Sequence, residues 1–336
     1  MIGIPERAVS PGDEFYRTYS AAQVAEVVDS LVRRAEFPYQ LTYVGGGSEL
    51  WRDGEERAGD GGGPARDFDT ILHRYAERLL ELVPPARPVR VVDLGPGTGR
   101  PIVGLLRHLG DQSRLAGYAG IDMSVELLEL AGRNLRAGLP EQAGSLELCH
   151  GDFSGPELAR VLSPVDSEGR DGPVRFVVLA GGTLYNFDEP ERLLRHVAAA
   201  MTGDDVLLAT VRVDTGVDRP PFMDQVSVGG PYKPQQLAGL DLLGVDRAWY
   251  VIETGFDPGR SEIFVRARFA EPVTVAFGSP HGAVSFAPGD TVLLWRYRYL
   301  DRPAVTSQLE RSGFEVRLFA SGEAAEAVLV AAMLKK

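Results

Sequence analysis

Between residues 89 and 214, short runs rich in β-branched residues alternate with segments whose apolar residues recur at helical spacing. The expected strands cover residues 89–95, 116–122, 145–152, 174–182 and 204–214. The expected helices between them cover residues 101–109, 125–136 and 189–201. Strands that alternate with helices in this way form βαβ units, in which helices cover both faces of a parallel sheet. This stretch therefore predicts an α/β core.

The pattern changes outside this stretch and suggests three parts. We expect residues 1–63 to form an N-terminal helical segment and a loop that contribute to a substrate pocket. Residues 64–214 and 301–336 are expected to form the core, closed by an antiparallel hairpin at the edge of its sheet. Residues 215–300 lose the alternation and contain runs typical of antiparallel strands, so they predict an inserted, smaller α+β domain that recognises substrate.

Two further helices are expected near the N-terminus, at residues 20–35 and 68–83, because apolar residues recur there at helical spacing. Glycine clusters lie between them, in residues 43–67, and predict a loop.

Composition excludes several classes of function. The chain has 336 residues and a formal net charge of −12, so it lacks the basic surface that binding to nucleic acid or to an anionic membrane requires. It has one cysteine, Cys149, which rules out an internal disulfide, and its longest apolar run, "AVLVAAML", is too short to span a bilayer. No signal peptide is recognisable at the start, so we expect a soluble, cytoplasmic protein. The five histidines show no metal-ligand spacing, and we expect no metal.

A glycine loop follows the first expected strand, in "VVDLGPGTGR" at residues 91–100. It lacks the Lys and Ser/Thr of a P-loop, and Arg100 stands where a dinucleotide fingerprint needs its third glycine. The pattern present is D-x-G-x-G-x-G, from Asp93 to Gly99. It resembles motif I of class I (Rossmann-like) methyltransferases that use S-adenosylmethionine (SAM) and release S-adenosylhomocysteine. The resemblance implies that the glycine backbone packs against the methionine and ribose part of SAM.

Acidic residues at the ends of the next two strands strengthen this interpretation. Asp122 ends the second strand, where a carboxylate accepts hydrogen bonds from both ribose hydroxyls. Asp152 and Phe153 follow the third strand, and the resemblance implies that they contact the adenine amino group and ring. Taken alone, either acid could equally be a turn residue or a helix cap rather than a cofactor ligand. The expected cofactor-binding residues are Asp93, Gly95, Gly97, Gly99, Arg100, Asp122, Met123, Asp152, Phe153 and Gly181.

Two segments carry a more specific resemblance, "YVGGGSELW" at residues 43–51 and "GGTLYNF" at 181–187. Together they resemble the histidine-specific methyltransferases of the ergothioneine pathway, which trimethylate the α-amino group of histidine, and the likeness extends from about residue 37 to the end. It implies that Asn186 holds the amino or carboxylate group of the substrate and that Tyr43 sits over the substrate, both as catalytic residues. Gly181 would leave room where cofactor and substrate meet. The alternatives are that Asn186 caps the following helix and that Tyr43 is an ordinary core or surface aromatic residue.

The sequence departs from this family where the imidazole of histidine would be recognised. Leu294 and Arg296 stand where the family has an acid and a hydroxyl residue. The family's second substrate tyrosine would fall near Asp60, where this sequence has no aromatic residue, and the family's loop is replaced around residues 220–234. We therefore expect a substrate other than histidine, with Leu294 and Arg296 among its binding residues. Arg296 suits a carboxylate or another anion, or is a surface arginine on a strand.

Together these patterns predict a SAM-dependent N-methyltransferase that acts on the amine of an amino acid or of an amino-acid-derived small molecule. One alternative is a SAM-binding enzyme that performs cyclisation or elimination on such a compound in specialised metabolism. Another is a SAM-binding subunit that works through a partner chain. A small-molecule substrate is expected, and a helper chain is not predicted.

Overall fold

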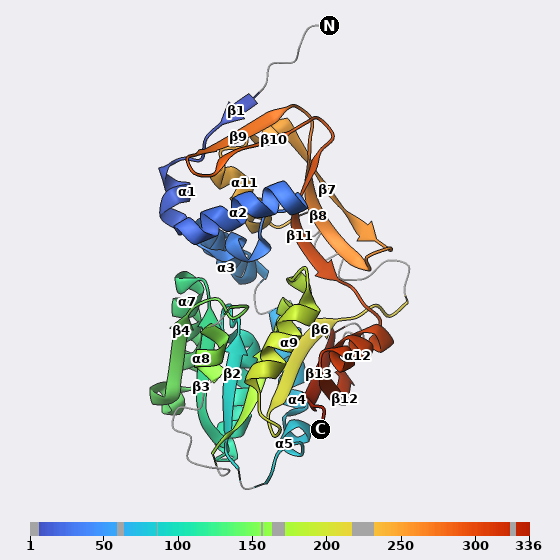
Figure 1. Cartoon of the computed structure of the whole chain (residues 1–336). Coiled ribbons are helices and arrows are strands. Elements are labelled where there is room, and N and C mark those ends of the chain that lie inside the picture. Colours follow the sequence, from blue (N-terminus) through green and yellow to red (C-terminus); the bar gives the residue numbers. More distant parts are fainter. Residues whose placement is uncertain are drawn as a thin grey trace, which may run out of the picture. The chain divides into compact units, whose positions relative to one another are not determined.

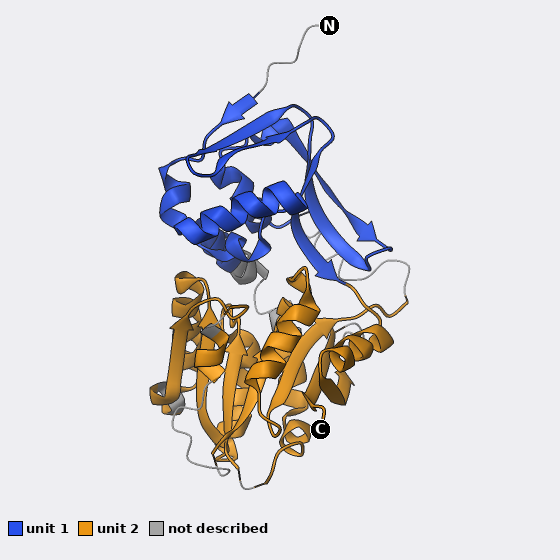
Figure 2. Ribbon diagram, viewed as in Figure 1, with its two compact units in different colours: residues 1–54, 219–298 blue, residues 55–218, 299–336 orange. Residues whose placement is uncertain are grey.

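The computed structural model describes residues 7–58, 64–85, 87–155, 157–162, 172–216, 232–322 and 327–336. The chain divides into two compact units (Figure 2). Unit 1 comprises Met1–Gly54 and Arg219–Arg298, and unit 2 comprises Glu55–Asp218 and Tyr299–Lys336. Most of the expected N-terminal segment therefore shares a unit with most of the expected inserted domain.

Unit 2 is built on a seven-stranded sheet with the order β12-β13-β6-β5-β2-β3-β4 (Figure 1). Its strands are β2 (Val89–Leu94), β3 (Leu115–Asp122), β4 (Leu146–His150), β5 (Val174–Leu179), β6 (Val206–Arg212), β12 (Phe314–Ser321) and β13 (Ala327–Leu334). The first five are parallel, whereas β13 is antiparallel to both β6 and β12. This is the class I core with a closing antiparallel hairpin, as the sequence predicts.

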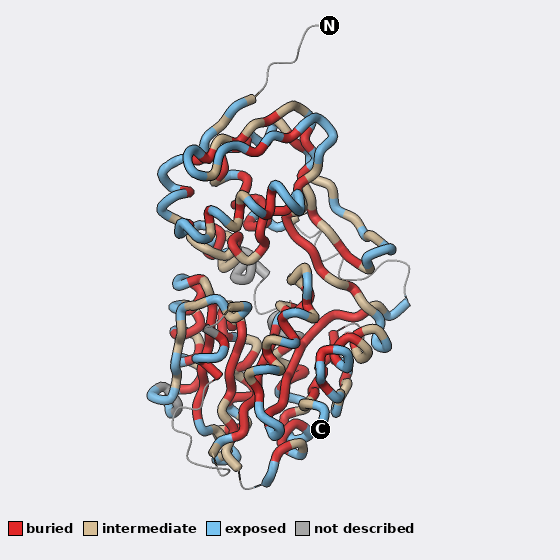
Figure 3. The backbone as a smooth tube through the Cα atoms, in the orientation of Figure 1, coloured by how far each residue is buried: buried red, intermediate tan, exposed pale blue. Residues whose placement is uncertain are grey.

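Helices cover both faces of this sheet because its strands are apolar on both sides. Every residue of β5 is buried, for example, as expected of a central parallel strand (Figure 3). The helices are α4 (Pro64–Arg74), α5 (Ala76–Leu80), α6 (Val103–Asp111), α7 (Val125–Gly138), α8 (Glu157–Leu162), α9 (Pro190–Ala200) and α12 (Arg302–Arg311). The single helix expected at 68–83 is divided at Tyr75, which leaves helical geometry with a ψ of 8°.

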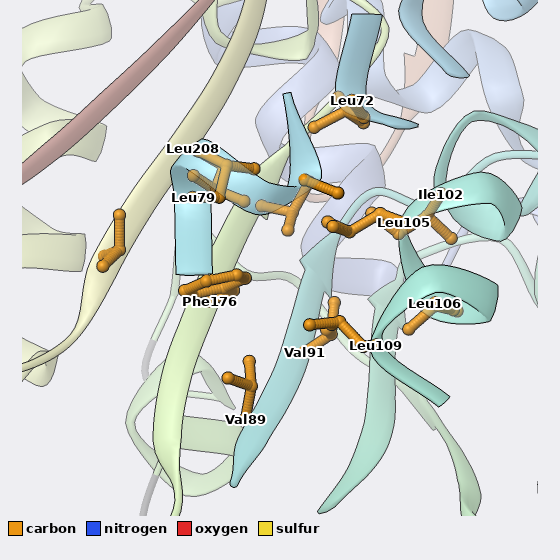
Figure 4. Close-up of a cluster of buried hydrophobic side chains, with 14 of the residues drawn as sticks. Leu72, Leu79, Val89, Val91, Ile102, Leu105, Leu106, Leu109, Phe176 and Leu208 are labelled. Atoms are coloured by element: carbon orange, nitrogen blue, oxygen red, sulfur yellow. The ribbon is translucent and has the colours of Figure 1, made fainter. Parts of the chain in front are cut away.

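One core cluster joins α4, α5, α6 and α7 to one face of the sheet. Figure 4 shows Leu72 and Leu79 from the first two of these helices, and Leu105 from α6, with Val91 and Phe176 of the sheet. The strand order reverses between β5 and β2, and right-handed crossovers then place α8 and α9 on the opposite face. In such sheets, ligands bind at the carboxyl ends of the strands where the order reverses.

Unit 1 contains two three-stranded sheets, with the orders β1-β9-β10 and β11-β8-β7. The strands are β1 (Arg7–Val9), β7 (Tyr250–Asp257), β8 (Glu262–Phe269), β9 (Val273–Gly278), β10 (Gly282–Phe286) and β11 (Thr291–Arg298). The helical segments are α1 (Asp13–Thr18), α2 (Ala21–Arg34), η1 (Tyr39–Tyr43), α3 (Gly46–Ala58), η6 (Pro234–Leu237), α11 (Ala238–Leu242) and η7 (Arg247–Trp249). The expected helix at 20–35 is α2, which begins at a capping box formed by Ser20 and Gln23.

The prediction of a loop over residues 43–67 is wrong for most of this range, because α3 and the start of α4 occupy it. The glycines there allow the chain to enter α3 rather than preventing a helix. Gly45 takes a left-handed conformation, with a φ of +62°. A Cβ at Gly47 would lie 1.9 Å from the carbonyl oxygen of Thr42, so only glycine permits this close approach. Asp60, near which the family's second substrate tyrosine would fall, lies outside the described residues, as does most of the replaced loop at 220–234.

Across the described parts of the chain, no helix combines the length and the apolar character that a bilayer crossing requires.

Candidate active site

The loop after β2 places three glycines in left-handed backbone conformations: Gly95 (φ +75°), Gly97 (φ +55°) and Gly99 (φ +71°). The backbone amide of Gly95 donates a hydrogen bond to the carbonyl of Ile121 (2.9 Å), which ties the loop to β3. The amide of Gly99 donates to the carbonyl of Pro96 (2.8 Å) and closes a tight turn. A Cβ at Gly99 would lie only 3.1 Å from Cγ of Leu135 in α7. The loop therefore depends on glycine both for its conformation and for its packing.

Asp93, at the end of β2, is 1% exposed, and its carboxyl group is only partly satisfied. The hydroxyl of Tyr118 donates a hydrogen bond to Oδ2 (3.1 Å), whereas Oδ1 is buried and has no hydrogen-bond partner among the described residues. Burial raises the pKa of Asp93 to about 7, the hydrogen bond from Tyr118 opposes this shift, and the charge of Asp122 adds to it. The site thus contains a buried acceptor that can take a donor or a positive charge from a ligand.

Asp122, at the end of β3, is also buried and is held by backbone amides. Its Oδ1 accepts a hydrogen bond from the amide of Ser124 (3.0 Å). Burial raises its pKa to about 6, while hydrogen bonds from the amides of Ser124, Gly97 and Met123, and the nearby His150, lower it. The carboxylate therefore connects the glycine loop with the end of β3 and is mostly ionised at neutral pH.

Asp152 and Phe153 follow β4. Asp152 is exposed, and its Oδ1 accepts hydrogen bonds from the amide (2.8 Å) and the hydroxyl (2.7 Å) of Ser154, so it closes a turn. The ring of Phe153 packs over the glycine loop, since a Cβ at Gly95 would lie 3.3 Å from its Cε1. Phe153 also meets the ring of Phe187 edge to face, with the centroids 5.8 Å apart. These contacts bring the ends of β2, β4 and β5 together around one loop.

Gly181 and Asn186 follow β5. Gly181 has a φ of +74°, and a Cβ there would meet no atom within 4 Å. Asn186 ends η5 (Thr183–Asn186), and its Oδ1 is buried with no hydrogen-bond partner among the described residues. Asn186 is not the cap of the next helix, because the residue at the N-cap of α9 is Glu189. The alternative interpretation of Asn186 as a helix cap is therefore wrong.

Arg100 and Met123 flank these groups. Arg100 begins η2 (Arg100–Ile102) directly after the glycine loop, and its side chain is exposed. Met123 follows Asp122 and is half-buried, and Nε2 of His150 lies 3.0 Å from its carbonyl oxygen. All ten expected cofactor-binding residues therefore lie at the carboxyl ends of β2 and β3 or in the segments that directly follow β2, β3, β4 and β5.

The other expected substrate residues lie in unit 1. Tyr43 is half-buried and packs edge to face against Tyr39 and Trp51, with centroid distances of 5.0 and 6.1 Å. Leu294 is 1% exposed and stands at a register shift in β11, where Leu293 and Trp295 pair with consecutive residues of β8.

Arg296 is 3% exposed, so it is not the surface arginine of the alternative interpretation. Its Nη2 donates a hydrogen bond to Oε2 of Glu36, and its Nη1 lies 3.7 Å from Oε2 of Glu262. These two buried carboxylates neutralise the guanidinium within unit 1. The contacts do not support binding of a substrate anion by Arg296, and that role stays a prediction.

Two residues of this region were not anticipated. Tyr118 hydrogen-bonds to Asp93, and the hydroxyl of Thr210 in β6 accepts a hydrogen bond from the amide of Gly181 (3.0 Å). Tyr118 stands two residues before a strand glycine and four before Asp122, which is a spacing that can be read from the sequence. Nothing local in the sequence distinguishes Thr210 from an ordinary buried strand residue.

The residues at this edge fit a cofactor such as SAM. Left-handed glycines allow close backbone approach, Asp122 offers acceptors for hydroxyl groups, and the partly unsatisfied Asp93 suits a cationic ligand. Within the described ranges, no group of three or more His, Cys, Asp or Glu side chains is arranged to hold a metal ion.

Comparison with known proteins agrees with this geometry. The sequence profile of a family described as histidine-specific, SAM-dependent methyltransferases matches residues 23–219. A search of curated proteins found no match.

Similar solved structures include the CcbJ methyltransferase from Streptomyces caelestis, with 15% identity over 80% of this chain and 90% of that one and a TM-score of 0.42. A SAM-dependent methyltransferase from Clostridium acetobutylicum has 11% identity over 86% and 99%, with a TM-score of 0.43. CalS10, an amino pentose methyltransferase from Micromonospora echinaspora, has 13% identity over 85% and 97%, with a TM-score of 0.42. At such identities and TM-scores, the functional assignment depends on the sequence family and on the geometry of unit 2.

Proposed function

Because the chain belongs to the family of histidine-specific, SAM-dependent methyltransferases, we propose that it methylates the amine of an amino acid, or of a small molecule derived from one, other than histidine. The family fixes the enzyme class and the cofactor. The nature of the acceptor group and the exclusion of histidine are the parts that we propose from the residues.

In this proposal, the loops at the carboxyl edge of the seven-stranded sheet hold the cofactor. The backbone of Gly95, Gly97 and Gly99 lies along the methionine and ribose part, Asp122 accepts from the ribose hydroxyls, and Asp152 with Phe153 contacts the adenine. When bound, SAM supplies a methyl group that its sulfonium already activates. The enzyme's own residues then have to position a nucleophile and keep it unprotonated, and such positioning is worth roughly 7–11 kcal/mol.

The buried amide oxygen of Asn186 is the observation that carries the proposal of an amine acceptor. A buried oxygen without a partner is costly, and an amine N–H removes that cost by donating to it. Because the amide is neutral, it orients the amine without stabilising the ammonium form as a carboxylate would. The lone pair of the amine therefore stays available for attack, while water or a weak base takes the proton.

Gly181 supports the same proposal, because no atom lies within 4 Å of where its Cβ would be. We propose that reacting groups use this space between the end of β5 and Asn186. Tyr43 stays a proposed substrate residue because its segment, residues 43–51, resembles that of the family.

The exclusion of histidine is based on the positions where the family recognises imidazole. Leu294 offers no hydrogen-bond acceptor, and Arg296 is already paired with Glu36 and Glu262. A site that lacks the partners of a polar side chain loses much of its preference for it. We propose that the side chain of the true substrate differs accordingly.

Replacement of Asn186 tests the amine-binding role. Asn186→Ala should lower the turnover of the amine substrate by about 100-fold, because the nucleophile loses its orientation. The affinity for SAM, measured by calorimetry, should stay within about threefold of the wild type. Gln112→Ala, at the exposed end of α6, serves as the control and should change neither quantity. Equal losses of turnover and SAM affinity in Asn186→Ala would assign Asn186 to the cofactor site or to folding instead.

A further inference from the structure

Tyr118 reaches Asp93 through a gap that a glycine leaves open in β3. Asp93 in β2 pairs directly with Gly120, and Tyr118 stands two residues before Gly120 on the same face of the strand. A Cβ at Gly120 would lie 3.0 Å from the hydroxyl oxygen of Tyr118 and 3.2 Å from its Cε1. The ring therefore lies across the glycine, and its hydroxyl reaches Oδ2 of Asp93 (3.1 Å).

This contact is fully buried and involves the acid that adjoins the glycine loop. Tyr118 and Asp93 are each 1% exposed, so the hydrogen bond is shielded from water. It leaves Oδ1 of Asp93 as a buried acceptor without a partner among the described residues. Among the described residues, the charged and titratable groups that act on Asp93 are Tyr118 and Asp122, both from β3, and His150 acts in turn on Asp122.

We propose that Tyr118 is a positioning residue for the cofactor: its hydroxyl orients Asp93 and favours the ionised carboxylate, which stabilises the cationic SAM when it binds. This inference goes beyond the proposed function and depends on the cofactor alone, not on the identity of the substrate. SAM carries positive charge on its sulfonium and on its ammonium group. A buried carboxylate beside the loop that holds it is a partner for that charge.

A proton balance follows from this arrangement. Burial raises the pKa of Asp93 to about 7, so a large fraction of the free enzyme carries a protonated Asp93 just below neutral pH. A bound cation favours the carboxylate and lowers this pKa, so the proton leaves Asp93 for the solvent as SAM binds. Well above pH 7 the carboxylate is already ionised, and no proton is released.

Removal of the hydroxyl should therefore act in a pH-dependent manner. In Tyr118→Phe the carboxylate loses a charge-assisted hydrogen bond, so the pKa of Asp93 rises further. At a pH below the pKa of Asp93, SAM affinity should fall by about tenfold for each unit by which the variant raises this pKa. At pH 9 most of the loss should disappear. A purely structural role of Tyr118 predicts the same loss at every pH.

The test is calorimetric titration of the full-length protein with SAM between pH 6 and 9, in buffers of different ionisation enthalpy, which reports both affinity and proton release. The wild type should release a proton on binding near pH 6.5 and none at pH 9. Tyr118→Phe should extend this release to higher pH, and Asp93→Asn should remove the component that centres near pH 7. Tyr75→Phe removes a tyrosine hydroxyl that bonds to the carbonyl of Ser321 (3.4 Å) and should match the wild type.

A loss of affinity in Tyr118→Phe that is the same at all pH values would overturn the proposal. So would a wild-type enzyme that binds SAM near pH 6.5 without releasing a proton. If Tyr118→Phe fails to fold, the comparison of the wild type with Asp93→Asn decides: an unchanged proton release in Asp93→Asn would overturn it. Because none of these readouts requires turnover, a wrong substrate assignment leaves the result unaffected.

Discussion

The backbone amide of Gly181 donates a hydrogen bond to the hydroxyl of Thr210, 3.0 Å away, so a side chain of β6 fixes the segment that leaves β5. The amide of the next residue, Gly182, donates to the carbonyl of Thr210 (3.0 Å). Thr210 is fully buried, and its two acceptors hold the turn that leads to Asn186. The orientation of a proposed substrate residue thus depends on a strand that was not expected to take part.

Thr210→Val is the variant that isolates this contact, because valine keeps the shape and removes only the acceptor. The amide of Gly181 is left unsatisfied, which should lower the free energy of unfolding by about 1–3 kcal/mol. Turnover should fall by more than SAM affinity, since the change affects the segment that carries Asn186. Denaturant unfolding, SAM titration and steady-state kinetics measure the three effects. A variant with wild-type turnover would show that the turn does not need this hydrogen bond.

A pair of glycine substitutions distinguishes crowding from backbone strain in the cofactor loops. Gly99 and Gly181 are both left-handed, so alanine at either position costs about 1–2 kcal/mol in backbone strain. Only at Gly99 does the new Cβ also meet a neighbour, 3.1 Å away at Leu135. Gly99→Ala should therefore destabilise the protein more than Gly181→Ala and should weaken SAM binding. Equal unfolding free energies for the two variants would contradict the packing described for the loop.

The buried ion pair of Arg296 and Glu36 makes a prediction about stability rather than about the substrate. Arg296→Met removes the buried cation that Glu36 and Glu262 share and leaves them only the more exposed Arg34 (3.8 Å) and Arg298 (3.5 Å), which should cost about 3 kcal/mol of stability. Adding Glu36→Gln should recover part of this loss, because one buried and only weakly compensated charge is removed. Thermal and denaturant unfolding of both variants provide the comparison. If Arg296→Met is as stable as the wild type but loses substrate affinity, Arg296 binds a substrate anion as the sequence first suggested.

The raised pKa values of Asp93 and Asp122 predict how the stability of the SAM-free protein changes with pH. Folding raises the pKa of Asp93 from the ordinary value of 3.8 to about 7, and it raises the pKa of Asp122 from 3.8 to about 6. The folded state therefore binds more protons than the unfolded chain between about pH 4 and 7, and the two groups make stability fall as pH rises through this window.

Asp93→Asn should flatten this part of the profile, because asparagine does not ionise. Unfolding free energies at pH 5 and pH 8 for both proteins, each without SAM, measure the difference. The wild type should lose more stability than the variant between the two values. A variant profile parallel to that of the wild type would mean that Asp93 is ionised throughout.

The sequence was sufficient to predict the core because its signals are local there. The alternation around Val91 and Phe176 identifies buried parallel strands, and the glycine pattern with Asp93 and Asp122 marks the ends of two of them. The closing hairpin also followed from periodicity. Long-range contacts were harder to foresee. Gly47 resembles a loop residue in isolation, yet it lies in the first turn of α3, where the carbonyl oxygen of Thr42 approaches it too closely for any other residue.

The substrate residues show the same limit. Arg296 also fits a surface arginine on a strand, but residues 294–297 of β11 are all buried, next to a register shift at Leu294. The carboxylate that neutralises Arg296 comes from Glu36, which is 260 residues distant in sequence. An ion pair between residues so far apart leaves no periodic signal in the sequence, so the pairing of Arg296 with Glu36 could be found only in the folded chain.

The most direct test of the account is a mass-spectrometric analysis of products after incubation of the enzyme with SAM and single amino acids, histidine included. The account predicts that at least one amino acid or close derivative gains one or more methyl groups on its amine, that S-adenosylhomocysteine forms in matching amount, and that histidine stays unchanged. Methylation of histidine, or consumption of SAM without any methylated amine, would contradict it.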